Sequence, residues 1–279
     1  MDKKVVEIIR QALLEDGYDK DITTLNLIDK EKTLAGSFIA KSTGVVSGID
    51  VVKEVFRQIN PKIIVDVLKD NGSFVNRGDV IASIEGPMRD ILRGERVALN
   101  FLQRLCGIAG VTAKFIQELA NTDCVITGTR QTTPLLRILE RQAILDGGGN
   151  NGRFNLSDQV VISGNHIAAV GSIKNAVDTI RKTVGKSMKI AVEVESKEEF
   201  IEVQNTSADI IVVDNLSNDL IKDMIELNVK NKKIEVSGNI ELKRVRSIAL
   251  LGVDSISISS LTHSYKALDI QLKFYKKFK

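Results

Sequence analysis

Two carboxylates and two arginines stand out in the second half of the sequence. Glu193 and Asp214 lie toward the ends of two apolar runs, Arg130 follows another such run, and Arg153 ends a glycine-rich stretch. A carboxylate in an apolar pocket has a raised pKa and can act as a general base. A carboxylate paired with either arginine would stay ionised and have no catalytic task. Both interpretations stay open for Glu193 and Asp214, because perturbed acids mark active sites only statistically.

The elements that must position these residues form a train of short Val- and Ile-rich runs, each followed by a helix-like segment. The runs are 124–129, 160–164, 189–195, 210–215, 234–239 and 255–260. They start about 20 to 35 residues apart, which is the size of a βα unit. Strands buried on both faces have this composition. The pattern predicts a parallel α/β barrel of six or seven strands with its chemistry at the strand ends.

Other residues with possible chemistry lie near these ends. Gly147, Gly148 and Gly149 expose backbone N–H groups and could cradle a phosphate, although glycines also serve flexible loops. His166 follows the second run, and only one further histidine is present, which excludes a histidine-rich metal site. Ser163, His166 and Asp214 could be assembled into a hydrolytic triad, but their spacing does not support one.

The first half of the chain alternates helices and strands without the cadence of the second. Helices are predicted over 3–15 and 51–59, and strands over 34–49, 63–68 and 80–85. Residues 87–119 predict one long helix or two abutting helices, with glycines that indicate a bend or a close helix contact. We expect a separate α/β domain here.

Composition limits the class of protein. The net charge of +3 is too small to argue for nucleic acid, and the Lys-rich stretch Lys273–Lys279 is expected to be a solvated end. Aromatic residues make up 4%, so the core must be aliphatic. The two cysteines have no metal-ligand spacing and are expected to be buried and reduced, as in the cytoplasm. No apolar run approaches a membrane span.

Several motifs together resemble the quinolinate phosphoribosyltransferase family. They include Gly94-Glu95-Arg96, Thr129-Arg130-Gln131-Thr132-Thr133-Pro134, Gly147-Gly148-Gly149, Asn165-His166-Ile167, Glu193-Val194-Glu195, Val213-Asp214-Asn215, Ser237-Gly238-Asn239-Ile240 and Leu261-Thr262-His263-Ser264. The resemblance implies an N-terminal α/β sandwich over 1–104, to which 265–279 return, and an incomplete barrel over 105–264. It also implies a homodimer with its site near the interface.

The family's reaction converts quinolinate and phosphoribosyl pyrophosphate to nicotinate mononucleotide, carbon dioxide and pyrophosphate, with magnesium. The resemblance implies Glu193 and Asp214 as catalytic residues and tentative Mg²⁺ ligands, and Gly147–Gly149 as the phosphate site. The implied substrate-binding residues are Arg96 from a partner subunit, Thr129, Arg130, Arg153, Ser163, His166, Ser237, Gly238, Asn239, Ser259 and Ser260. If the chain is not a phosphoribosyltransferase, we expect no cofactor.

Departures from the family pattern gather where the barrel mouth is expected. The family usually has Asp-Thr-Arg-Lys, Asn-His-Arg and Lys-Asp-Asn-His where this chain has Gly128-Thr129-Arg130-Gln131, Asn151-Gly152-Arg153 and Ser163-Gly164-Asn165-His166. Ala191 likewise replaces a glutamate. Each lost charge-assisted bond weakens binding of an anion by about 1.5–3 kcal/mol. We therefore expect severely weakened native activity on an anionic or aromatic small molecule.

Two other functions remain open at this level. One is a divergent or redesigned enzyme on the same scaffold that uses a pocket carboxylate as general base on a neutral, flat substrate. The other is a dimeric binding protein that kept the fold and lost the chemistry, since function lies in the site and not in the fold.

Overall fold

The computed structural model describes residues 1–275, which form two compact units. The first contains Met1–Ala113, Thr132–Gly148 and the residues from Leu261 on, and the second contains Lys114–Gln131 and Gly149–Ser260. The loop and helix over 132–148 thus belong to the first unit, although they lie within the barrel part of the sequence. The predicted domain boundary at 104/105 stays a prediction, because compactness alone does not establish independent folding.

The first unit is built on a four-stranded antiparallel sheet of order β13-β1-β5-β3. Its strands are β1 (Thr33–Ala40), β3 (Ile64–Val67), β5 (Val80–Pro87) and β13 (Ile270–Phe274), and a small second ladder pairs β2 (Gly44–Val45) with β4 (Phe74–Val75). Lys273, which was expected in a solvated end, is part of strand β13. Residues 276–279 of that predicted end lie outside the described residues.

The helices of the first unit bury aliphatic side chains at helical spacing. In α1 (Lys3–Glu15) the buried residues are Val5, Ile9 and Leu13, and the carboxylate of Asp2 caps the helix by accepting the Lys4 N–H at 2.7 Å. The others are η1 (Tyr18–Lys20), α2 (Ile22–Leu27), α3 (Ile49–Ile59), α4 (Met88–Gln117), which runs on into the second unit, and α5 (Arg137–Asp146). The short α11 (Ser260–His263) follows the last barrel strand.

Helix α4 is continuous, and one of its glycines is explained by a close backbone approach. A Cβ atom at Gly107 would lie 2.6 Å from the carbonyl oxygen of Lys266. Three residues earlier, Arg104 pairs with the fully buried Glu140 at 2.5 Å, and the Thr133 N–H donates to the same carboxylate at 3.0 Å. Arg104 therefore fixes the start of α5 through a buried carboxylate.

The second unit is a seven-stranded parallel sheet of order β7-β6-β12-β11-β10-β9-β8. Its strands are β6 (Val125–Gly128), β7 (Asn150–Asn151), β8 (Val160–Ile162), β9 (Ile190–Val194), β10 (Ile210–Asp214), β11 (Lys233–Ser237) and β12 (Ser255–Ile258). Six strands coincide with the six predicted runs. Strands β7 and β8 end the sheet without pairing to each other, so the predicted incomplete α/β barrel is confirmed.

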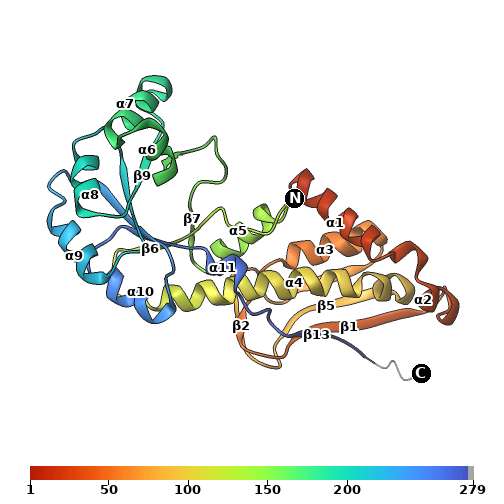
Figure 1. The fold of residues 1–279 in the computed structure, drawn as a ribbon. Helices are drawn as coiled ribbons and strands as arrows, with labels where there is room; N and C mark the ends of the chain where they lie inside the picture. Colours follow the sequence, from red (N-terminus) through yellow and green to blue (C-terminus); the bar gives the residue numbers. More distant parts are fainter. Residues whose placement is uncertain (276–279) are drawn as a thin grey trace. The chain divides into compact units, whose positions relative to one another are not determined.

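Helices on the outside of these strands cover the sheet (Figure 1). They are α6 (Gly164–Val170), α7 (Ile173–Val184), α8 (Lys197–Gln204), α9 (Asn218–Glu226) and α10 (Leu242–Ala249). Ser172, Ser196 and Ser217 cap α7, α8 and α9 by accepting a backbone N–H of the first turn. Ser196 and Ser217 follow β9 and β10 by short loops, whereas Ser172 separates α7 from the preceding α6.

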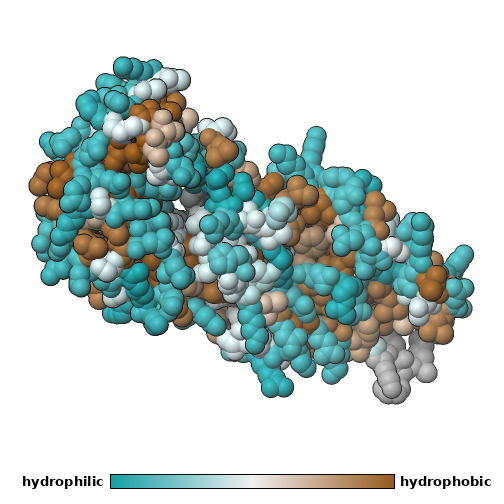
Figure 2. Space-filling model, in the orientation of Figure 1, coloured by the Kyte–Doolittle hydropathy of each residue, from teal (hydrophilic) through white to brown (hydrophobic). Residues whose placement is uncertain are grey.

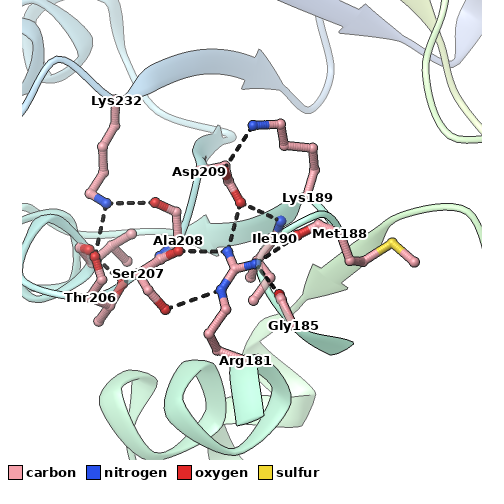
Figure 3. A network of polar contacts seen from close by, with 11 residues as sticks. Arg181, Gly185, Met188, Lys189, Ile190, Thr206, Ser207, Ala208, Asp209 and Lys232 are labelled. Atoms are coloured by element: carbon pink, nitrogen blue, oxygen red, sulfur yellow. Dashed lines mark hydrogen bonds and ion pairs between the residues drawn. The ribbon is translucent and has the colours of Figure 1, made fainter. Parts of the chain in front are cut away.

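The amino-terminal ends of β9, β10 and β11 are tied together by a network of charges (Figure 3). Arg181 donates to the carbonyl oxygens of Gly185, Met188 and Ser207 at 2.7–2.8 Å and to Asp209 at 2.8 Å. Asp209 also accepts from Lys189 and from the Ile190 N–H, both at 3.0 Å. Burial acts to raise the pKa of Asp209, but these hydrogen bonds outweigh it and lower that pKa.

On the face shown in Figure 2, hydrophilic residues cover most of the surface and hydrophobic ones show in separate places. This is the usual mixture on a protein surface. Within residues 1–275, no helix is both long and apolar enough to cross a bilayer. The cytoplasmic location stays a prediction.

Candidate functional site

A cleft of 640 Å³ opens at the carboxyl ends of the parallel strands, within the second unit. Strands β6 and β8–β12 and the segments that follow β6, β7, β10, β11 and β12 contribute to its wall. A larger cavity, of 830 Å³, lies in the first unit among α1, α3 and α5. We assign the site to the smaller cleft, because parallel barrels carry their chemistry at the carboxyl ends of the strands.

Two guanidinium groups share the wall of this cleft. Arg130 follows β6, and Arg153 follows β7, whose Asn151 pairs with Gly128 at the end of β6. Burial, followed by the positive charge of Arg130, lowers the pKa of Arg153. The negative charges of Glu193 and Asp158 act in the opposite direction but do not outweigh these two effects. Because guanidinium groups bind carboxylates and phosphates through paired hydrogen bonds, this pair is the part of the cleft best suited to an anion.

The predicted acids face the same cleft from adjacent strands. Glu193 lies near the end of β9, and Asp214 ends β10. Asp214 accepts hydrogen bonds from the hydroxyl of Ser237 and, at 3.1 Å, from the side-chain amide of Asn215. Burial, then repulsion by Asp214, raises the pKa of Glu193, against the opposing effects of Arg153 and His166. Glu193 is therefore a partly buried carboxyl group that experiences charges of both signs.

A third acid, Glu235, lines the cleft and was not predicted. Glu193, Val212 and Glu235 are register partners across β9, β10 and β11, so the two glutamates stand at the same level of the barrel. Ser255 lies 3.4 Å from the Glu235 carboxylate, and Ser257 also donates to it. Burial raises the pKa of Glu235 more than these hydroxyls lower it. The sequence signal that could have identified Glu235 is its position as a charged residue between Ile234 and Val236 in a buried strand.

Comparison with known proteins covers both units. The protein-family model described as "Quinolinate phosphoribosyl transferase, N-terminal domain" matches residues 21–106. The family model for the C-terminal domain matches residues 108–273. The chain belongs to the quinolinate phosphoribosyltransferase family.

Individual relatives in this family are similar over their whole length. A probable carboxylating nicotinate-nucleotide pyrophosphorylase of Bacillus subtilis is 38% identical over 266 residues, which is 95% of this chain and 92% of that protein. The crystal structure of NadC from Streptococcus pyogenes has a TM-score of 0.92 and 38% identity, over 96% of this chain and 94% of that one. A nicotinate-nucleotide pyrophosphorylase from Francisella tularensis has a TM-score of 0.92 at 31% identity, over 98% and 96%.

Of the residues that the family resemblance implied, most are gathered in the cleft and some lie elsewhere. Those in the lining are Thr129, Arg130, Arg153, Glu193, Asp214, Ser237, Gly238, Asn239 and Ser259, joined by Gln131 and Gly152. Ser163, His166 and Ser260 are outside the lining. Arg96 is an exposed residue of α4 in the first unit. A role for Arg96 in the site therefore depends on the proposed dimer.

Ser163 and His166 form a local pair that ends β8 and begins α6. The Ser163 hydroxyl lies 2.8 Å from Nδ1 of His166, and the Ser163 N–H donates to the same nitrogen at 3.1 Å. Nδ1 of His166 therefore accepts a hydrogen bond from the Ser163 backbone N–H and helps to cap the start of α6. Asp214 is bonded instead to Ser237 and Asn215, so the structure gives no support to a triad of Ser163, His166 and Asp214.

The first two residues of the triple glycine lie at the carboxyl end of α5. The N–H groups of Gly147 and Gly148 donate to Ala143 and Leu145 at 3.0 and 2.9 Å, where α5 ends. A Cβ atom at Gly147 would lie 2.5 Å from the Ala109 carbonyl oxygen, so glycine is required for packing on α4. The carboxyl end of a helix repels anions. Phosphate binding by Gly147–Gly149 stays a prediction. It has less support than the sequence suggested, because the N–H groups of Gly147 and Gly148 are already used in hydrogen bonds to α5.

Gly152 packs closely against the end of β6. A Cβ atom built at Gly152 would lie 3.0 Å from the carbonyl oxygen of Gly128. Strands β6 and β7 therefore approach each other closely at two of the positions where this chain departs from the usual family pattern. At Gly164, by contrast, no atom lies within 4 Å of the added Cβ.

Proposed function

We propose that the cleft transfers the phosphoribosyl group of phosphoribosyl pyrophosphate to quinolinate, with release of pyrophosphate and carbon dioxide, and that it does so slowly. The observation that carries this proposal is the pair of guanidinium groups, Arg130 and Arg153, at the carboxyl ends of a parallel barrel. Quinolinate is a dianion with adjacent carboxylates, and guanidinium groups bind carboxylates through paired hydrogen bonds. The relatives' names as carboxylating pyrophosphorylases support the same reaction.

The acids of the cleft suit the second substrate. In this proposal Glu193 and Asp214 bind ribose hydroxyls and would hold a magnesium ion together with the substrate's own phosphates. The donor set fits, because Mg²⁺ takes oxygen ligands and is commonly bound by one or two carboxylates plus phosphates. Within residues 1–275, no cluster of three potential metal-ligating side chains occurs, so the protein alone supplies a partial site. When bound, magnesium neutralises charge on the departing pyrophosphate.

The slow rate follows from the charges that line the cleft. Three carboxyl groups, Glu193, Asp214 and Glu235, face two guanidinium groups, although both proposed substrates are anions. Gln131 and Gly152 line the cleft without charge at positions where the family usually has a cation. Ser163 carries a hydroxyl already held by His166. Binding and transition-state stabilisation both lose electrostatic support.

We also propose that the chain functions as a homodimer in which Arg96 of one subunit adds to the cleft of the other. Arg96 is exposed on α4, and its neighbour Glu95 has a pKa raised by burial. Mass measurement by light scattering is expected to give a dimer. A monomeric mass would contradict this part of the proposal.

The function is tested by incubating the protein with quinolinate, phosphoribosyl pyrophosphate and Mg²⁺ and measuring nicotinate mononucleotide. We expect product at well below about one turnover per second. We also expect each substrate to raise the melting temperature. Turnover at an ordinary rate would contradict the proposed slowness, and absence of both product and thermal shift would contradict the function.

A further inference from the structure

The proposed reaction needs a proton at a carbon atom, and few groups in the cleft can supply it. After the ring nitrogen of quinolinate has attacked C1 of the ribose and pyrophosphate has left, the bond between C2 of the ring and its carboxyl group must break. Carbon dioxide leaves, the electron pair stays on C2, and this carbanion must gain a proton. Arginine cannot give one, because its pKa is above about 12.

The side chains that line the cleft limit which groups can act as the proton donor. Among the described residues that form the lining, there is no lysine, histidine, cysteine or tyrosine. Hydroxyl groups of serine and threonine are too weakly acidic to remain useful donors near neutral pH. Within this lining, the groups that can supply the proton are therefore the carboxylic acids, with water that enters the cleft as the other source.

The three carboxyl groups differ in their surroundings. The Asp214 carboxylate is already engaged, because it accepts hydrogen bonds from the hydroxyl of Ser237 and the side-chain amide of Asn215. Glu193 is opposed to Arg153, and that charge favours ionisation. Glu235 has only hydroxyl groups as hydrogen-bond partners, Ser255 and Ser257, and takes part in none of the ion pairs found in residues 1–275.

The geometry of the barrel places this acid where a ring could reach it. Glu235 lines the cleft at the level of Glu193, two residues before Ser237, whose hydroxyl marks the strand end. Val161, Ala191 and Val212 supply apolar wall to the same cleft. A flat ring held by Arg130 and Arg153 through its carboxylates can present its reacting edge to the buried carboxyl group.

We propose that Glu235 is the acid that protonates C2 of the ring after carbon dioxide has left. The proton passes from the carboxyl oxygen to C2, the O–H bonding electrons stay on the carboxylate, and solvent restores the proton after product release. A prompt proton also prevents carbon dioxide from recombining with the carbanion in the confined cleft. The inference rests on the proposed function, and assigns Glu235 to its second chemical step only.

The test measures the two steps separately under single-turnover conditions. Pyrophosphate reports transfer, and carbon dioxide from quinolinate radiolabelled at the carboxyl group beside the nitrogen reports decarboxylation. The wild-type protein is expected to release both in equal amounts. In Glu235→Gln we expect pyrophosphate release within about twofold of wild type, carbon dioxide release about 100-fold slower, and accumulation of the dicarboxylated mononucleotide by mass spectrometry. Glu235→Asp keeps an acid and should recover part of the loss.

The matched control is Glu226→Gln, which alters an exposed glutamate on α9. Both products should be released as in wild type. The pH dependence gives a second measurement on the unmodified protein. The ratio of carbon dioxide to pyrophosphate should fall as pH rises through the raised pKa of Glu235. The other charged groups that face the cleft are Arg130, Arg153, Glu193 and Asp214, so the variant is needed to assign the pH dependence to Glu235. Glu235→Gln should lose this pH dependence.

Each outcome decides a different claim. Equal release of both products by Glu235→Gln would overturn the role of Glu235 and leave the transferase function standing. Pyrophosphate without carbon dioxide in wild type would also overturn it. Release of neither product by wild type would contradict the proposed function itself, and the inference with it. If Glu235→Gln does not fold, a wild-type ratio that is constant with pH would overturn the inference, and a falling ratio would support it.

Discussion

The two ends of the parallel strands carry similar side chains in opposite arrangements. At the amino-terminal end, Arg181, Lys189 and Asp209 are matched in sign and joined by hydrogen bonds. At the carboxyl-terminal end, Arg130 lies close enough to Arg153 to lower its pKa, and Asp214 raises the pKa of Glu193. The amino-terminal end joins charges of opposite sign, whereas at the carboxyl-terminal end like charges also act on one another. The first arrangement is typical of structural ion pairs, and perturbed groups such as the second are more frequent at ligand-binding sites.

The largest expected effect is at the amino-terminal end. Replacing Arg181 by Met removes hydrogen bonds to three carbonyl oxygens and leaves Asp209 with fewer partners. The Arg181 and Asp209 side chains are 17% and 24% exposed, so little solvent compensates. We expect a loss of about 3 kcal/mol in the free energy of unfolding, measured by urea denaturation. Substrate binding per folded molecule should be unchanged, and a loss of affinity would show that the two ends are coupled.

The next effect is at the carboxyl-terminal end. Arg153→Met should weaken quinolinate binding by about 2 kcal/mol, because one charge-assisted contact is lost. The free energy of unfolding should change less than in Arg181→Met, because burial and repulsion by Arg130 oppose the favourable effects of Glu193 and Asp158 on the Arg153 charge. Calorimetric titration and urea denaturation on the same sample would separate the two quantities. A large loss of stability would mean that Arg153 serves the fold, contrary to the comparison.

A smaller effect is expected from restoring positive charge. Gln131→Lys combined with Ser163→Lys should tighten quinolinate about tenfold, which corresponds to about 1.4 kcal/mol. The gain should shrink at high salt, because exposed charges are screened. Glu226→Lys is a suitable control, because a lysine added outside the cleft should not change the affinity for quinolinate. Equal affinity in the double variant would show that cations at 131 and 163 do not reach the ligand.

The smallest effect is a difference in the sign of pH dependence. The pKa of Asp209 is lowered by folding, so its contribution to stability is present above its ordinary value of 3.8 and is lost as pH falls through the folded value. The pKa of Glu235 is raised, so stability falls as pH rises from 4.5 toward the folded value. Asp209→Asn and Glu235→Gln should each remove one slope from the urea stability profile. Slopes of the same sign would contradict the comparison.

The fold could be predicted because its repeating units are encoded locally. Six apolar runs at βα spacing correspond to β6 and β8–β12, and the family motifs fixed the remaining topology. Strand β7 was missed because Asn150 and Asn151 have low strand propensity, and only pairing with Thr127 and Gly128 makes them a strand. Short edge strands of this kind depend on tertiary contacts that a local pattern does not contain.

The site was predicted at strand ends and missed inside the strands. Glu193, Asp214, Arg130 and Arg153 were found because the chemistry of a parallel barrel is expected at its mouth. Glu235 was overlooked, since one acid between two apolar residues has no distinctive spacing. The packing of Gly147 on Ala109 was not anticipated, because this close approach is visible only in three dimensions, and phosphate binding by Gly147–Gly149 stays a prediction.

The close packing of Gly152 on the Gly128 carbonyl oxygen decides which departures from the family pattern can be altered one at a time. A side chain at 152 requires the end of β6 to move by a few tenths of an ångström. A Cβ atom added at Gly164 meets no atom within 4 Å. A single substitution is therefore accommodated more easily at 164 than at 152, where a second change in β6 is needed to make room.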